Sequence, residues 1–390
     1  MTSTDLSAGH TCVPDTGIDV GATRPGIMQV TDTLVAGGLE RVAVNLANAL
    51  PVASYRSHLC TTRREGPLAE LIAPHVGRLR LQRDSRFDVQ ALRHLVRYVR
   101  ENRIRILHAH GTSLFISVLA SFFQPHPIVL WHQHGGWLAG LERSPWWLRR
   151  LAKRVVGVIV VNRALRDWCI RALRMPEDRV WYIPNFVCMP EVVEAAAGLP
   201  GKPGFRIASV ANLLPPKDPL NLLRAMQIVA RASPDAHLLM VGRKGDNGYM
   251  KLLLAEATDP ILRDRVSFLG VRSDVPAILK ACDIGVLSSA SEGFPLALVE
   301  YGLARLPAVA TRVGQCEEIL DGGRVGLLVP PSTPDELARA LLLLLESSAR
   351  RTELGAGFRR HIRQTYSPER IMQQMSGIYK SVINPSNGAG

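Results

Sequence analysis

Short apolar segments alternate with longer amphipathic ones along most of this 390-residue chain. The apolar segments, such as Ala281–Ser289, are short and end in small polar residues, which is typical of buried parallel strands. The longer segments repeat apolar residues at helical spacing, as at Leu222, Met226 and Val229. Because strands and helices alternate in both halves, the pattern predicts an α/β chain with two doubly wound, Rossmann-like domains facing a cleft.

The same pattern predicts where the domains begin and end. Residues 1–24 are polar and lack the basic-then-apolar order of a signal peptide, so we interpret them as a flexible leader. Residues 190–204 combine proline, glycine and an alanine run without a clear period, which predicts a linker between domains at 25–189 and 205–365. A final helix is predicted within 366–385. The expected strands are 26–31, 57–61, 104–110, 127–134, 155–161, 180–187, 205–211, 236–241, 266–270, 281–289, 307–311 and 326–329. A capping box at Thr333 is expected to start the helix 334–346, and the segment 272–276 is expected to cap the helix before Ala281.

One strand–loop–helix segment carries candidate chemistry. A strand that ends at Ser289 is followed by a Gly-Phe turn, and a helix is predicted from Pro295 to about Ala304. Glu292 lies in the loop and Glu300 on the helix face. The free N–H groups of the first helical turn lie between them, so the segment suits a phosphate flanked by sugar or ribose hydroxyls. An ordinary strand–loop–helix unit with solvated glutamates fits the same spacing.

Two loops elsewhere offer further groups for a phosphate. Gly37 and Gly38 follow the first strand and would let the backbone approach a ligand closely, although such a turn is equally common as a structural feature. No Gly-x-Gly-x-x-Gly occurs, which argues against a dehydrogenase-type dinucleotide site. Lys217 precedes a helix that Asp218 caps and Pro219 opens. A cation at this place suits a diphosphate, and a solvated loop lysine is the alternative.

Four histidines end two neighbouring strands, at 108, 110, 132 and 134. Ligands in open α/β sheets bind beyond the carboxyl ends of strands, so we expect His110 and His134 to meet there. No acidic residue stands at metal-ligand spacing beside them, and metal binding is therefore a minor alternative.

Charge and composition narrow the function classes only partly. The net charge of +13 suits nucleic acid, an anionic membrane surface or a phosphorylated substrate. A basic helix begins after Pro145, and it either lies on an anionic bilayer or covers the sheet with its cations solvated. Its candidate membrane residues are Trp146, Trp147, Arg149, Arg150, Lys153 and Arg154.

No apolar run reaches the ~20 residues of a membrane span. The six cysteines show no Cys-x-x-Cys, which fits a reducing cytoplasm.

The segment 291–310 resembles the Glu-x7-Glu signature of retaining glycosyltransferase family 4, in which Gly-Phe-Pro commonly follows the first Glu. Gly-Gly-x-Glu-Arg at 37–41, His-Gly at 134–135 and Ile-Pro-Asn at 183–185 agree, and the resemblance covers about residues 26–365. It implies the GT-B fold, a C-terminal helix that crosses back to the first domain, and transfer of a sugar from a nucleotide-diphosphate sugar with retention. No Asp-x-Asp occurs, so no metal or other cofactor is expected.

The resemblance also implies roles for residues. His134 and Glu292 are the expected catalytic residues, with His132 in reserve; Glu300 would hold the ribose, and Arg272 would lie near the base. Ala211-Asn212 stands where Gly-Arg is usual, and Asn cannot offer a phosphate the positive fork of Arg, so Arg243 or Lys244 is the expected substitute. The expected donor-binding residues are Gly37, Gly38, Asn212, Lys217, Arg243, Arg272, Gly293, Phe294, Pro295, Leu296 and Glu300.

The resemblance makes 25–189 the acceptor domain and 205–365 the nucleotide-sugar domain. The acceptor domain is basic and carries the tryptophan helix, which favours a lipid-linked or cell-envelope glycan as acceptor and a cytoplasmic protein peripheral to the inner face of the membrane. Another GT-B nucleotide-sugar enzyme, such as an epimerase or a phosphorylase, would share the pocket. A nucleic-acid-binding protein would need basic repeats interleaved with aromatic residues, and none is visible.

Overall fold

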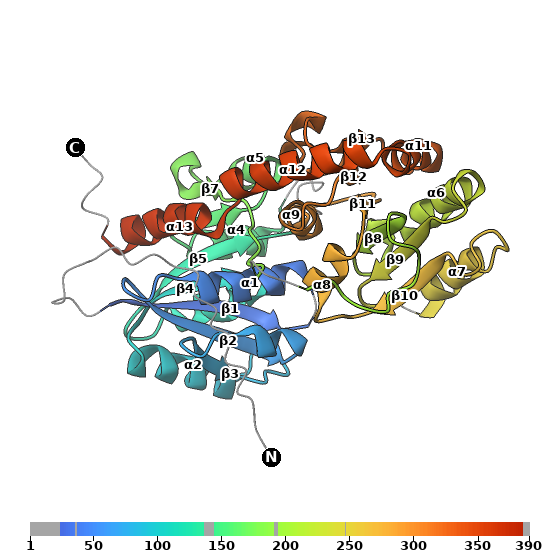
Figure 1. Cartoon of the computed structure of the whole chain (residues 1–390). Helices are drawn as coiled ribbons and strands as arrows, with labels where there is room; N and C mark the ends of the chain where they lie inside the picture. Colours follow the sequence, from blue (N-terminus) through green and yellow to red (C-terminus); the bar gives the residue numbers. More distant parts are fainter. Residues whose placement is uncertain (1–23, 36, 136–143, 191–193, 246, 385–390) are drawn as a thin grey trace, which may run out of the picture.

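Two parallel sheets lie side by side, each with helices packed on its faces (Figure 1). The computed structural model describes residues 24–35, 37–135, 144–190, 194–245 and 247–384. The first sheet has the strand order β3-β2-β1-β4-β5-β6-β7, and the second has the order β10-β9-β8-β11-β12-β13. In the first sheet, β2 and β3 lie on one side of β1, and β4 to β7 lie on the other. In the second sheet, β9 and β10 lie on one side of β8, and β11 to β13 lie on the other. Such sheets bind ligands at the point where the strand order switches sides, which is between β1 and β4 and between β8 and β11. The predicted doubly wound α/β fold is confirmed.

The first domain is built from alternating strands and helices up to β7. Asp88 begins α2 by accepting a hydrogen bond from Ala91 N at 2.9 Å, and Asn162 caps α5 in the same way at Leu165 N. The strands are β1 Gly26–Thr33, β2 Arg56–Arg64, β3 Gly77–Arg80, β4 Ile104–His110, β5 Ile128–Gln133, β6 Gly157–Val160 and β7 Val180–Tyr182. The helices are α1 Gly38–Ala49, α2 Val89–Glu101, α3 Leu114–Ala120, α4 Trp146–Ala152 and α5 Arg163–Arg171.

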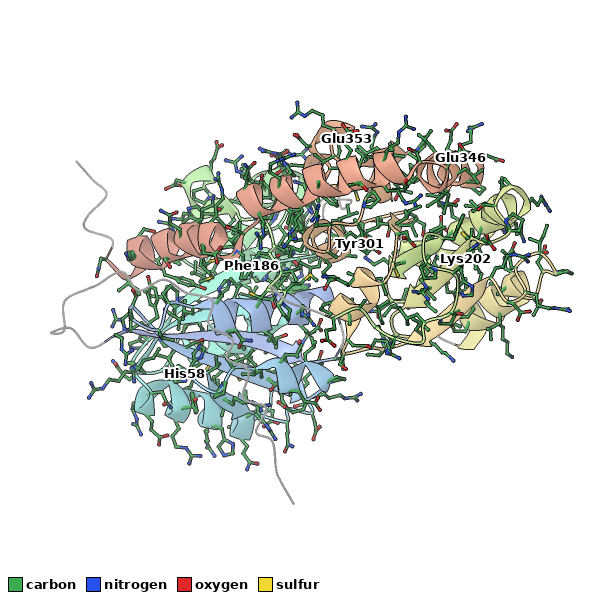
Figure 2. The ribbon with its side chains drawn as sticks, in the orientation of Figure 1. His58, Phe186, Lys202, Tyr301, Glu346 and Glu353 are labelled. Atoms are coloured by element: carbon green, nitrogen blue, oxygen red, sulfur yellow. The ribbon has the colours of Figure 1, made fainter. Side chains whose placement is uncertain are left out.

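The second domain repeats this alternation. Its strands are β8 Arg206–Val210, β9 His237–Val241, β10 Val266–Gly270, β11 Ile284–Leu287, β12 Ala308–Thr311 and β13 Leu327–Val329. Its helices are α6 Pro219–Ala232, α7 Asn247–Ala257, α8 Val275–Lys280, α9 Leu296–Leu303, α10 Cys316–Ile319, α11 Pro334–Leu345 and α12 Ser348–Thr365. Tyr301 of α9 is fully buried on the side of this domain that adjoins the first (Figure 2), and its hydroxyl accepts from Val210 N and donates to Val286 O.

The last helix, α13 (Pro368–Ile383), packs on the first domain rather than on the second (Figure 1). Its buried residues Met372, Met375 and Tyr379 share a hydrophobic cluster with β1, β4 and β5 and with Phe186, which follows β7 (Figure 2). The chain therefore crosses between the two domains twice, once after β7 and once between α12 and α13.

Several local predictions need correction. The Thr333 hydroxyl donates to Pro330 O at 2.7 Å and makes no cap bond, so the predicted capping box is wrong. Asp274 makes no cap bond either, because its carboxylate is held by Arg272. α9 begins one residue after Pro295, which occupies the N-cap. Strand β3 and the helices α3, α5, α7, α10 and α12 were not predicted. Of the proposed leader, linker and final helix, residues 1–23, 191–193 and 385 lie outside the described residues.

Candidate functional site

Glu292 is held by a cation and a hydroxyl at the carboxyl end of the second sheet. Lys217 Nζ lies 2.7 Å from both carboxylate oxygens, and Ser289 Oγ donates to Oε1 at 2.7 Å. The Glu292 side chain is only 6% exposed, whereas Lys217 is 32% exposed. The pair therefore presents its cation to the solvent and keeps its carboxylate inside.

Two loops fix this pair by backbone contacts. Ala290 N and Ser291 N both donate to Pro216 O, and Ser288 Oγ donates to Lys217 O at 3.1 Å. Gly314 has a φ of +52°, and a Cβ there would meet Glu292 O at 2.3 Å, so the loop after β12 can approach only with glycine. The sequence predicted Glu292 and Lys217 separately, and the structure brings them together.

Helix α9 offers free backbone donors beside this pair. Its N-cap, Pro295, provides no side-chain cap bond, so the first N–H groups of the helix have no side-chain partner among the described residues. Phe294 is buried with its ring edge-on to Tyr366 at 5.5 Å, and Leu296 packs against hydrophobic residues of the first domain. The start of α9 thus lies where the two domains meet.

Glu300 faces the first domain from the same helix. Burial raises the pKa of its carboxyl above the usual range, and the nearby Arg41 guanidinium of α1 lowers it in part. This places the Gly-Gly-x-Glu-Arg segment opposite α9. Gly37 is the N-cap of α1, which also lacks a side-chain cap bond, and an added Cβ at Gly38 would meet nothing within 4 Å. Two uncapped helix N-termini therefore belong to this junction, one from each domain.

Asn212 contacts the backbone of Arg243, the residue expected to supply the missing cation. Its Oδ1 accepts from Arg243 N at 3.0 Å, and Leu213 N donates to Arg243 O. Gly242, with a φ of +152°, permits this approach because a Cβ there would meet Ala211 O at 2.1 Å. The exposed Arg243 side chain follows β9 beside the loop that carries Lys217. Arg272, in contrast, is paired with Asp274 at 2.6 Å in an exposed position.

The histidines form a stack at the carboxyl end of the first sheet. His110 Nδ1 lies 3.0 Å from His134 Nε2, so the predicted meeting of these two residues is confirmed. The His132 ring stacks on that of His134 at 4.1 Å and is tilted against that of His110 at 5.1 Å. Burial, with the neighbouring imidazoles in part, lowers the pKa of all four below the ordinary value of 6.5, to about 3 for His108 and His134.

The orientation of the rings in this stack does not suit the coordination of a metal ion. Ligand nitrogens of His108, His110 and His132 all lie within 4.8 Å of one another. However, His108 lies at 18° to the ring of His110 and at 15° to that of His132, so their in-plane lone pairs run alongside each other and do not converge. The described residues around these rings add no carboxylate to the group.

Comparison with known proteins identifies the family. The model of "Glycosyltransferase Family 4" matches residues 36–189, and that of "Glycosyl transferases group 1" matches residues 195–361. The two matches follow one another along the chain and leave only short segments uncovered. The chain belongs to glycosyltransferase family 4. It is an enzyme, a transferase of the GT-B fold.

Relatives and solved structures agree with this assignment. The transferase is 25% identical over 329 residues to the Escherichia coli UDP-Gal:alpha-D-GlcNAc-diphosphoundecaprenol alpha-1,3-galactosyltransferase, over 78% of this chain and 84% of that one. It is 30% identical over 189 residues to the Corynebacterium glutamicum D-inositol 3-phosphate glycosyltransferase, over 47% and 45% of the two chains.

Two solved structures share the fold. Anabaena HepE in complex with UDP and glucose has a TM-score of 0.76 at 22% identity, over 91% of this chain and 99% of that one. Sucrose-phosphate synthase from Thermosynechococcus elongatus also has a TM-score of 0.76, at 20% identity, over 93% and 100%.

The basic helix α4 of the transferase exposes its aromatic residues. Trp146 is 72% and Trp147 47% exposed, and Arg154 lies over the ring of the exposed Phe122 at 4.9 Å. Arg149 is different, because its Nε donates to Ser144 Oγ and to Ala172 O and thus holds α4 against the end of α5. Within the described residues, no helix is both long and apolar enough to cross a bilayer.

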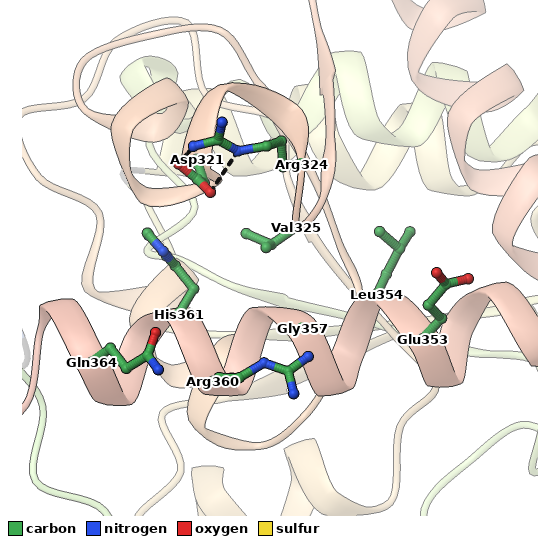
Figure 3. Close-up of a pocket in the computed structure, with 9 residues that line it drawn as sticks. All are labelled: Asp321, Arg324, Val325, Glu353, Leu354, Gly357, Arg360, His361 and Gln364. Atoms are coloured by element: carbon green, nitrogen blue, oxygen red, sulfur yellow. Dashed lines mark hydrogen bonds and ion pairs between the residues drawn. The ribbon is translucent and has the colours of Figure 1, made fainter.

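A separate cavity of about 370 Å³ lies on α12, away from these residues (Figure 3). Arg324 is held there by Asp321, with its Nε 2.8 Å from the carboxylate, and the other lining side chains belong mainly to α12. None of the predicted site residues lines this cavity.

Some residues of the site carried no signal in the sequence. Arg41 belongs to the Gly-Gly-x-Glu-Arg motif, but its position opposite Glu300 depends on the packing of the two domains. Ser289 ended a predicted strand without an assigned role. Gln29 and Tyr379 touch the histidine stack from β1 and α13, and only the folded topology brings them there.

Proposed function

We propose that this enzyme transfers a sugar, with retention at the anomeric carbon, from a uridine diphosphate sugar to a lipid-linked or cell-envelope glycan. The observation that carries the proposal is the Lys217–Glu292 pair beside the uncapped start of α9. The UDP-sugar in the name of the Escherichia coli relative, and the UDP bound to Anabaena HepE, favour uridine as the base. The diphosphoundecaprenol acceptor of that relative favours a lipid-linked acceptor.

The geometry suits a ligand that is anionic at one end and rich in hydroxyls at the other. A diphosphate would compete with Glu292 for Lys217, and the exposed Arg243 and the N–H groups of α1 and α9 would add to its binding. Once Lys217 turns to the phosphate, the Glu292 oxygens become free to accept hydrogen bonds from sugar hydroxyls. Glu300 would accept from the ribose hydroxyls, and His134 would contact the sugar from the first domain.

The reaction then needs no protein nucleophile. The acceptor oxygen attacks the anomeric carbon, the bond from that carbon to the diphosphate breaks on the same face, and the acceptor proton passes to the leaving phosphate oxygen. Lys217, Arg243 and the helix N-termini stabilise the negative charge that develops on the diphosphate. We expect this stabilisation to replace a divalent cation.

The test is product analysis with UDP-sugars and a polyprenyl-diphosphate-linked sugar acceptor. We expect a new glycosidic bond with the anomeric configuration of the donor, formed equally well in EDTA. Lys217→Ala should lower kcat/KM by about 10²–10³, the usual cost of removing one charge-stabilising donor. Lys202→Ala is the matched control, because Lys202 (Figure 2) pairs with the exposed Asp235, lies over the ring of Phe205 and is not a residue of the candidate site. An inverted product, an epimerised donor without transfer, or loss of activity in EDTA would each overturn the proposal.

We propose further that the enzyme works at an anionic membrane surface, with α4 as the contact. The exposed Trp146 and Trp147 would enter the interfacial region, and Arg150, Lys153 and Arg154 would face lipid phosphates. This location would bring a lipid-linked acceptor to the first domain.

A further inference from the structure

A chain of hydrogen bonds connects the C-terminal helix to His134. Gln29 Nε2 donates to Tyr379 Oη at 3.2 Å, and Gln29 Oε1 lies 2.8 Å from His110 Nε2. The other ring nitrogen of His110 lies 3.0 Å from His134 Nε2. Tyr379, Gln29 and His110 are at most 1% exposed, so water does not compete for these bonds.

The Gln29 amide gives this chain a direction, because an amide oxygen only accepts and an amide nitrogen only donates. His110 Nε2 must therefore carry the hydrogen that reaches Gln29 Oε1. Burial, chiefly, lowers the pKa of His110 far below 6.5, so the ring is neutral and its Nδ1 has no hydrogen. His134 Nε2 must then donate to that nitrogen.

The remaining nitrogen of His134 is thereby a bare acceptor. Burial lowers the pKa of His134 to about 3, so the ring stays neutral near pH 7. Its Nδ1 is buried and makes no hydrogen bond among the described residues. An Nδ1 with a free lone pair and no hydrogen accepts from a hydroxyl but does not bind an ether or a carbonyl oxygen.

Tyr379 contacts the amide from the other end, in the orientation in which Gln29 Nε2 donates to its hydroxyl. The same hydroxyl lies 2.7 Å from His108 Nδ1, so its own hydrogen can go to that nitrogen while it accepts from Gln29. A reversed amide would place Nε2 against His110, and each hydrogen bond along the chain to His134 would reverse. His134 would then present an N–H in place of a lone pair.

We propose that Tyr379, Gln29 and His110 are positioning residues that hold His134 in its Nε2-protonated form, so that its Nδ1 accepts a hydrogen bond from a free hydroxyl of the donor sugar. This inference rests on the proposed function and deepens it, because it names the chemical group that the donor sugar must present. Donors with a deoxy, keto or O-methyl group at that position are selected against.

The direct test reads the tautomer without any substrate. In protein labelled with ¹⁵N-histidine, the signals of His134 are assigned by their loss in His134→Gln. We expect one protonated and one unprotonated nitrogen, with the hydrogen on Nε2, in a single state between pH 6 and 8. A hydrogen on Nδ1, or rapid exchange between the two forms in the wild-type protein, would overturn the inference.

Tyr379→Phe tests whether Tyr379 sets the tautomer of His134 through the intervening hydrogen bonds, and Tyr55→Phe is the matched control. Tyr55 also packs against α13, where its hydroxyl donates to Ser376 O and its ring lies 6.0 Å from that of Tyr379, but it takes no part in the chain of hydrogen bonds to His134. We expect Tyr379→Phe to shift the ¹⁵N signals of His134 toward a mixture of tautomers, and Tyr55→Phe to leave them unchanged. No shift in Tyr379→Phe, or equal shifts in both variants, would contradict the relay.

Kinetics then separates this inference from the proposed function. Tyr379→Phe should lower kcat/KM for the natural donor about tenfold, the effect of about one hydrogen bond, but should not lower it for the donor analogue that is deoxygenated at the hydroxyl facing His134. Equal losses for the two donors would overturn the inference even if transfer itself is observed. Absence of transfer by the wild-type enzyme would instead contradict the proposed function, while the tautomer measurement would still stand.

Discussion

Glu292 and Glu300 lie eight residues apart, but their side chains have different surroundings. Glu292 has its partners, Lys217 and Ser289, within its own domain, and its carboxylate is nearly buried. Glu300 faces Arg41 of the other domain, and burial raises its pKa. We therefore expect the arrival of a diphosphate to change the partners of Glu292, and closing of the domains to change those of Glu300. These two expectations follow from the packing of each carboxylate and could not be drawn from their spacing in the sequence.

His132 gives a residue-scale prediction. Both of its ring nitrogens are buried without a hydrogen-bond partner among the described residues, which is costly in a folded protein. We expect His132→Leu to raise the free energy of unfolding by about 1 kcal/mol at pH 7.5. Chemical denaturation measures this change. His110→Leu is the contrasting variant and should lose about 1–3 kcal/mol, because Gln29 and His134 would lose their partner.

The same variant has a pH dependence with a defined sign. The folded His132 has a pKa well below 6.5 because of burial, while the unfolded residue binds a proton near pH 6.5. Lowering the pH below 6.5 therefore favours the unfolded state, by up to about 1.4 kcal/mol per pH unit for this histidine. The advantage of His132→Leu should grow between pH 7.5 and 5.5. A constant or shrinking advantage would mean that the folded ring titrates normally.

For single residues, the sequence predicted positions correctly where the side chains lie at the ends of predicted strands. The convergence of His110 and His134 followed from two predicted parallel strands, and it is confirmed. The Thr333 cap failed because the hydroxyl found a nearer backbone acceptor in Pro330. The role of Asn212 could not be deduced, because its partner Arg243 lies on another loop that only the sheet order brings close.

At the scale of elements, most buried strands and amphipathic helices could be predicted because their apolar periods are strong. Helix α12 was missed because Gly355 and Gly357 interrupt a largely polar segment. The structure explains one of these glycines, since a Cβ at Gly355 would meet Arg305 O at 2.1 Å. Strand β3 was missed because it is a four-residue edge strand with two arginines, and it lacks the apolar run of an interior strand.

Helix α4 gives a prediction at this scale. Trp146→Ser with Trp147→Ser should abolish most binding to vesicles that contain anionic phospholipid, because these side chains would supply the apolar part of the contact. Co-sedimentation with vesicles measures the binding. Phe87→Ser is the control, since Phe87 is similarly exposed, at 73%, but precedes α2. Equal binding by the double variant and the wild-type protein would end the proposal that α4 contacts a membrane.

At the scale of the whole molecule, the two crossings of the chain set how the domains are joined. α12 packs on α9 of the second domain, and α13 continues directly from it onto the first. A movement that opens or closes the donor site would therefore bend the chain both after β7 and near Tyr366–Ser367. Phe294 touches Tyr366, so one of these crossings lies against the loop that carries Glu292. The sequence indicated the two domains, but this contact depends on the folded arrangement.

We propose, above all, that the Glu292–Glu300 segment binds a nucleoside diphosphate sugar. Thermal unfolding with UDP, GDP, ADP, their sugars and NAD, on the wild-type enzyme and on Glu300→Gln, tests it most directly. A ligand at about 100 times its dissociation constant adds about 2.7 kcal/mol to the folded state. We expect UDP and a UDP-sugar to stabilise the wild-type enzyme, and we expect this stabilisation to be weaker in Glu300→Gln and unchanged in the exposed control Glu353→Gln (Figure 2). Stabilisation by none of these ligands, or equal stabilisation of wild type and Glu300→Gln, would contradict it.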